Sequence, residues 1–100
     1  MEIRYDIRKY SQGETYKKID TFLDGLVKEH SNQISNPEKE WNNKRDRMDF
    51  KFKVMGLKIS GDIKLLEGKL IFSGNLPFPA RLYKGRIEET IKENLKKVFP

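Results

Sequence analysis

Apolar and charged residues alternate along the first segment of the chain, from Glu2 to Lys9. Ile3, Tyr5 and Ile7 fall on one side of an extended backbone, and the charged residues between them fall on the other. A period of two is typical of a strand with one buried face. The segment therefore predicts a β-strand at the start of the chain.

The next segment changes to the period of a helix. Ser11, followed three residues later by Glu14, forms a capping box, which marks a helix start. One apolar stripe at helical spacing follows: Tyr16, Ile19, Leu23, Leu26 and Val27, with Phe22 beside it. The helix is predicted to end near His30, because residues 31–33 and 35–37 consist of loop-forming residues.

From residue 38 to residue 76 the pattern returns to strands. A short strand around Trp41 is followed by a polar turn, residues 42–46. Three alternating segments come next, residues 48–54, 57–65 and 70–76, with turns at Gly56 and at Glu67–Gly68. Strands joined by turns this short must be antiparallel neighbours.

Leu76–Pro79 ends the sheet, since proline cannot donate to a strand ladder. Pro79 suits the first turn of a last helix, whose apolar stripe is Tyr83, Ile87, Ile91, Leu95 and Val98. The order β-α-β-β-β-β-α predicts a single α+β domain over residues 1–100. We expect a two-layer sandwich, with an antiparallel sheet of four or five strands and two helices on one face.

Charge and composition exclude several classes of function for this chain. The chain has no cysteine, which excludes disulfides and thiol chemistry, and His30 is its one histidine. No catalytic or metal site and no cofactor is predicted. Residues 1–50 have no net charge, so the whole excess of +6 lies after residue 50 and suggests an anionic partner. No segment is apolar enough to be a signal peptide or to span a membrane, and we expect a cytoplasmic protein.

The C-terminal half resembles the polyhydroxyalkanoic acid system proteins, a bacterial family associated with polyester granule gene regions. The resemblance rests on Phe50-x-Phe52, Met55–Gly61, Leu76-Pro77-Phe78, Gly85–Ile91 and Leu95. It implies a granule-associated or accessory protein, which would bind the polyester surface or a coat protein. Its elements are glycine turns and core positions, so they bear on fold more than on activity.

Five lysines fall on the predicted outer face of the sheet: Lys51, Lys53, Lys58, Lys64 and Lys69. Such a face could hold a polyanion such as nucleic acid through phosphate contacts. Antiparallel sheets also commonly solvate one face with charge. We favour that simpler interpretation, because the outer face lacks the interleaved aromatic residues of single-strand binders.

Two apolar features complete the candidate sites. Gly61 and Gly74 leave room on the inner face, where an acyl chain could lie, but we favour the interpretation that such glycines mark bulges or let a helix approach closely. Trp41 and the corner at Pro77 and Phe78 could contact a granule or a partner, but we favour core packing for these residues. Ile71, on the polar face, slightly favours a homodimer.

We therefore predict, first, a non-enzymatic accessory protein that associates with polyester granules. The alternatives are a polyanion-binding module that uses the lysine face and a small acyl-chain carrier.

Overall fold

The computed structural model describes residues 1–100 and contains five strands, two α-helices and one short 3-10 helix, η1. The elements follow in the order β1 (Glu2–Asp6), α1 (Gln12–Glu29), β2 (Ile34–Trp41), β3 (Arg47–Val54), β4 (Leu57–Leu66), β5 (Lys69–Asn75), η1 (Ala80–Tyr83) and α2 (Lys84–Val98). This confirms the predicted α+β class and the order β-α-β-β-β-β-α.

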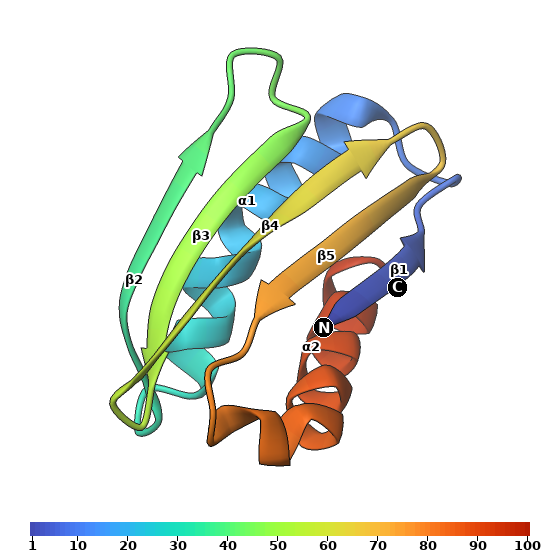
Figure 1. Ribbon diagram of the computed structural model, residues 1–100. Helices are drawn as coiled ribbons and strands as arrows, with labels where there is room; N and C mark the ends of the chain where they lie inside the picture. The colour runs from blue at the N-terminus through green and yellow to red at the C-terminus, as the bar shows by residue number, and fades with distance from the viewer.

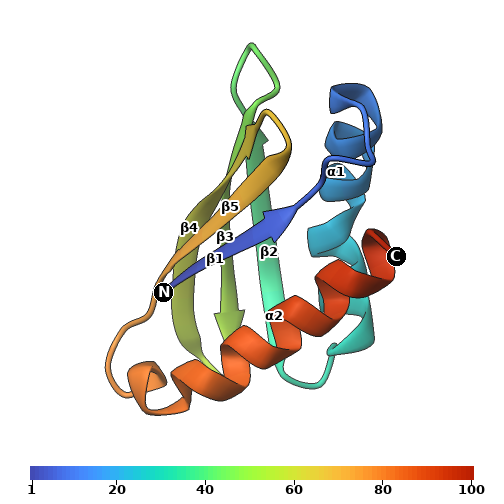
Figure 2. The same cartoon turned by 90° about the vertical axis from the view of Figure 1, so that its right-hand side faces the viewer.

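The five strands form one antiparallel sheet with the spatial order β1-β5-β4-β3-β2. The meander from β2 to β5 is continuous, and β1 joins it beside β5, opposite the edge formed by β2 (Figure 1). Both helices lie on the same side of the sheet (Figure 2). The predicted two-layer arrangement is therefore confirmed, and one face of the sheet is left uncovered.

Helix α1 begins with the predicted capping box. The Ser11 side chain accepts a hydrogen bond from the Glu14 amide at 3.1 Å, and the Glu14 carboxylate accepts one from the Ser11 amide at 2.9 Å. These bonds satisfy two amides that a helix start would otherwise leave free. The helix buries its apolar stripe against the sheet, and its C-cap is His30, where the end was predicted.

The inner face of the sheet supplies most of the core. Its buried strand residues include Ile3, Met48, Phe50, Phe52, Ile59, Ile63, Leu65, Leu70 and Phe72. The Phe50 ring centroid lies 5.0 Å from that of Phe72 and 5.7 Å from that of Phe52. The alternation in the sequence thus assigns the two faces of the sheet correctly.

The prediction of a loop over residues 35–37 is wrong, because β2 already begins at Ile34. The strand register shifts between Ser35 and Glu38, and Asn36 within this irregularity has a φ of +52°. Pro37 is tolerated because β2 is an edge strand, where one side of the backbone needs no donor. Loop-forming residues here mark a bulged edge strand.

The start of the last helix also differs from the prediction. Pro79 precedes η1, and α2 begins only at Lys84. A 3-10 helix has three residues per turn instead of the 3.6 of an α-helix. Tyr83 therefore does not share the apolar stripe of α2. The Tyr83 side chain is exposed, whereas Ile91, Leu95 and Phe99 reach the core.

Candidate functional site

All five predicted lysines lie on the uncovered outer face of the sheet. The strand register places Lys51 and Lys53 on β3, Lys58 and Lys64 on β4, and Lys69 at the start of β5. None of the five forms an ion pair within the chain. The structure therefore gathers these lysines as the alternation predicted.

Acidic residues interrupt that face. Together with Arg4 and Arg47, the basic side chains on it number seven, whereas the acidic ones number six: Glu2, Asp6, Glu38, Glu40, Asp49 and Asp62. A phosphate backbone that ran across the whole face would meet both signs. The excess of positive charge is local and lies near the turn that joins β3 to β4.

At that turn two lysines face each other. Lys53 and Lys58 are direct cross-strand partners, and they flank the two-residue loop Met55–Gly56. The other neighbour of Lys53 is Ser35, and Lys51 has Glu38 across the strands. Like charges opposite each other destabilise a sheet. The Lys53–Lys58 pair therefore lowers the stability of the fold, and no ion pair within the chain compensates for it.

The sequence analysis favours core packing for the corner at Pro77 and Phe78, but the corner is exposed. The Phe78 side chain is 75% exposed, and Pro77 beside it is half-buried. Leu82 and Tyr83 in η1 are also largely exposed, although the sequence analysis did not predict this for either residue. Only the change from α to 3-10 geometry places Tyr83 outside, and its spacing to Ile87 gave no signal of that change.

Two anchors hold this corner in place. Leu76 and Ala80 are buried, and the Arg81 Nε donates a hydrogen bond to the Leu76 carbonyl at 2.9 Å. The exposed side chains therefore stand on a fixed backbone. A surface hollow of about 330 Å³ lies next to them, lined by Met1, Gly74, Asn75, Leu76, Arg81 and Lys84.

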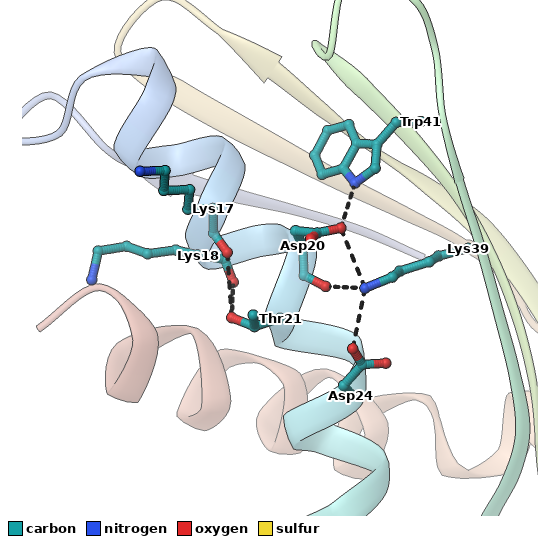
Figure 3. Close-up of polar contacts among 7 residues, drawn as sticks. All are labelled: Lys17, Lys18, Asp20, Thr21, Asp24, Lys39 and Trp41. Atoms are coloured by element: carbon teal, nitrogen blue, oxygen red, sulfur yellow. Dashed lines mark hydrogen bonds and ion pairs between the residues drawn. The ribbon is translucent and has the colours of Figure 1, made fainter.

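Trp41 does not join the corner. It lies at the far end of β2, packs against Tyr16 with ring centroids 4.7 Å apart, and is only half-exposed. Its indole nitrogen donates to the Asp20 carboxylate at 3.0 Å (Figure 3). We assign Trp41 to the packing of α1 on β2, which is the interpretation that the sequence analysis favours.

A polar cluster between β2 and α1 was not predicted. Lys39 is the charged residue of β2 that points inward, toward α1. Its ammonium group donates to the Asp20 carbonyl and lies 3.3 Å from the Asp20 carboxylate and 3.1 Å from that of Asp24 (Figure 3). Lys39 shares the inward face with Trp41, two residues later, and the bulge before Glu38 reverses the alternation with respect to Ile34.

The pKa values in this cluster favour its charged forms. The hydrogen bond from Trp41, and then that from Lys39, lowers the pKa of Asp20. Burial lowers the pKa of Lys39, but the hydrogen bonds to Asp24 and Asp20 outweigh it and the net pKa is raised. A lysine whose charged form is favoured by two carboxylates is a poor base and a poor nucleophile, so the cluster acts as an ionic clamp.

The glycine pair encloses no space for an acyl chain. A Cβ on Gly61 would collide with the Ser73 carbonyl oxygen and lie 2.8 Å from the Phe50 ring. One on Gly74 would lie 2.6 Å from the Met1 side chain. The space beside both glycines is therefore filled by the protein itself. The site that the acyl-carrier hypothesis requires is absent there.

The remaining predictions concern Ile71, metals and membranes. Ile71 lies half-buried on the outer face between Arg4 and Lys64. No group of three or more metal-ligating side chains comes together. Neither α-helix combines the length and the apolar composition that a bilayer crossing requires.

Comparisons with known proteins agree with the resemblance seen in residues 50–95. Neither the comparison with curated proteins nor that with solved structures gave a match. The model of one family, described as "putative polyhydroxyalkanoic acid system protein" and named for the granule region, matches residues 9–99. The chain therefore belongs to the polyhydroxyalkanoic acid system protein family.

Proposed function

We propose that this protein is a non-enzymatic accessory protein of the cytoplasm that binds the surface of polyester granules. The observation that carries the proposal is the exposed apolar corner at Phe78, Leu82 and Tyr83. Folded proteins seldom expose neighbouring large apolar side chains without a partner for them. Membership of the granule-region family indicates which kind of partner to test first.

The proposed lack of catalytic activity has its own support. Lys39, the partly buried lysine of the molecule's polar cluster, is protonated and held by two carboxylates. The exposed corner offers apolar side chains, arginine and lysine, which suit adhesion.

The test is co-sedimentation with polyester granules that have been washed free of lipid and protein. We expect the wild type to sediment with them, and the double variant Phe78→Ser/Leu82→Ser to lose about tenfold in affinity, because each change removes an exposed apolar contact. Leu66→Ser is the matched control, since Leu66 is exposed at the opposite end of β4.

A protein that stays in the supernatant with both washed and coated granules would refute the proposal. Sedimentation with coated granules alone would indicate that the protein binds a coat protein and not the polyester itself. Equal binding by wild type, corner variant and control would show that the corner is not the contact.

A further inference from the structure

Most of the exposed apolar side chains lie at one end of the molecule. Five large hydrophobic residues are exposed, and four of them, Met55, Phe78, Leu82 and Tyr83, belong to the β3–β4 turn and the η1 corner. Figures 1 and 2 both place this turn and η1 at the same lower end. The register agrees, because Asn75 at the end of β5 is opposite Ser60 near the start of β4.

Positive charge predominates at the same end, although Glu38 lies opposite Lys51 and Glu88 pairs with Lys84 at its border. This end is formed by residues 30–37, 51–60 and 75–86, which contain no aspartate or glutamate; we call it the hairpin–corner end. The Met55 amide donates to the Gln33 carbonyl at 2.9 Å and joins the first segment to the second. The basic residues of this end are Lys51, Lys53, Lys58, Arg81, Lys84 and Arg86.

These charges are almost unpaired within the protein. The only ion pair among them joins Lys84 to Glu88, at 3.8 Å. Beyond its Nε bond, Arg81 makes no side-chain hydrogen bond, and it lines the 330 Å³ hollow together with Lys84. The hollow therefore offers the terminal guanidinium nitrogens of Arg81 to an anionic headgroup, beside Lys84, which pairs with Glu88.

Met55 gives a second, independent observation. It lies in the two-residue loop with a φ of +51°, followed by Gly56 at +83°. Such a type I′ turn favours asparagine, aspartate or glycine at both positions. Here an apolar side chain occupies a disfavoured backbone conformation and is 80% exposed, so neither turn geometry nor packing explains the residue.

We propose that the hairpin–corner end docks on an anionic lipid surface. Interfacial proteins combine apolar side chains, which enter the boundary of the acyl region, with lysine and arginine at the headgroups. Nucleic acid would match the charges but leave the apolar side chains in water. A second copy would match the apolar side chains but bring two cationic ends together, so charge complementarity selects an anionic lipid.

This inference rests on the proposed function only in supposing that the protein adheres to a surface. The two are tested on different materials, because the granules above are free of lipid and the vesicles below contain no polyester. Granule binding can therefore fail while lipid binding succeeds, and the reverse.

The experiment is flotation with vesicles of phosphatidylcholine, with or without phosphatidylglycerol. We expect the wild type to bind the anionic vesicles at least about tenfold more strongly than the neutral ones. Binding should weaken as salt is added, since exposed charges are screened. Equal binding to both vesicles, or binding to neither, would overturn the proposal.

Two matched triple variants locate the contact. Lys53→Gln/Lys58→Gln/Arg86→Gln should lose about tenfold in binding to anionic vesicles, because three headgroup contacts disappear. Lys44→Gln/Lys64→Gln/Lys69→Gln removes the same charge elsewhere and should change binding less than about twofold. Equal losses would show that net charge alone acts.

The apolar contribution needs its own variant. Met55→Asn keeps all charges and suits the turn, so it should fold and still bind vesicles more weakly. Unchanged vesicle binding by both Met55→Asn and Phe78→Ser/Leu82→Ser would overturn apolar insertion. Duplex DNA that binds as tightly as the vesicles, and loses affinity with the same lysines, would identify a polyanion site instead.

Discussion

The two hairpins that share strand β3 differ in whether their charged residues are paired within the chain. At the β2–β3 turn, the Asn42 side-chain oxygen accepts the amides of Asp46 at 3.0 Å and Arg47 at 3.1 Å. The Arg47 guanidinium then bridges Asp49 and Asp62, at 3.2 and 3.3 Å. Asn42, Asp46 and Arg47 thus have partners within the chain, and these contacts are explained by folding alone.

The β3–β4 hairpin has none of this internal pairing. Lys53 faces Lys58, Met55 occupies a left-handed conformation, and no side-chain hydrogen bond braces the loop. Residues that fold stability does not explain indicate contact with something outside the chain. The comparison teaches that the same strand carries a structural end and an end available for binding.

The largest expected effect lies between the two ends, at Gly61 on β4. Gly61→Ala should lower the free energy of unfolding by about 3 kcal/mol, because the new methyl group meets the Ser73 carbonyl and the Phe50 ring. Denaturant unfolding measures the change. Gly25→Ala is the control: it has open space around it in α1 and should gain about 1 kcal/mol. A neutral Gly61→Ala would show that β4 and β5 separate easily.

Met55→Asn should stabilise the protein by about 1 kcal/mol, because asparagine tolerates a positive φ far better than methionine. Thermal unfolding of the purified variant checks this. Together with weaker vesicle binding, a gain in stability would show that the wild-type residue serves contact rather than folding. A loss of stability would mean that the Met55 side chain packs on the protein.

Neutralising one basic residue in each hairpin sharpens the comparison further. Arg47→Gln leaves Asp49 and Asp62 opposite each other and should cost about 0.5 kcal/mol. Lys53→Gln removes a like-charge pair and should gain about 0.5 kcal/mol. Both changes remove one positive charge, so opposite signs in urea unfolding would show that local pairing decides. The same sign for both would indicate an effect of net charge.

The smallest expected effect is on the loss of folding stability at low pH. Because the pKa of Asp20 is lowered in the folded protein, its contribution to stability is present above its ordinary value of 3.8 and is lost as the pH falls below that. Trp41→Phe removes the main cause of the lowered pKa. We therefore expect a shallower loss of stability between about pH 5 and pH 3 in this variant, measured by urea unfolding at each pH. An unchanged slope would mean that Lys39 alone sets the pKa of Asp20.

Much of the fold could be predicted from residue patterns. Alternation identified β1 and the three central strands, and the capping box at Ser11 and Glu14 gave the start of α1. These signals are local, because each depends on residues within one element. The lysine face followed from the same alternation, since side chains on one face recur every second residue.

What could not be predicted depends on contacts between distant segments. The β2 bulge reflects pairing with β3, and the ion pairs of Lys39 depend on the carboxylates of α1. The exposure of Tyr83 depends on a 3-10 turn that its spacing does not reveal. The union of the Met55 turn and the Phe78 corner at one end arises because β4 and β5 pair in antiparallel register.

Strand β1 has a consequence for the order of folding. It pairs Ile3 with Phe72, about 70 residues away, whereas the other strand pairs join neighbours in the chain. Closing so long a loop is entropically costly before the meander exists, so β1 should join the sheet after the rate-limiting step. Ile3→Val should then accelerate unfolding and leave the refolding rate nearly unchanged in stopped-flow experiments. In a cell, the chain would leave the β5 edge open until its first residues returned to cover it.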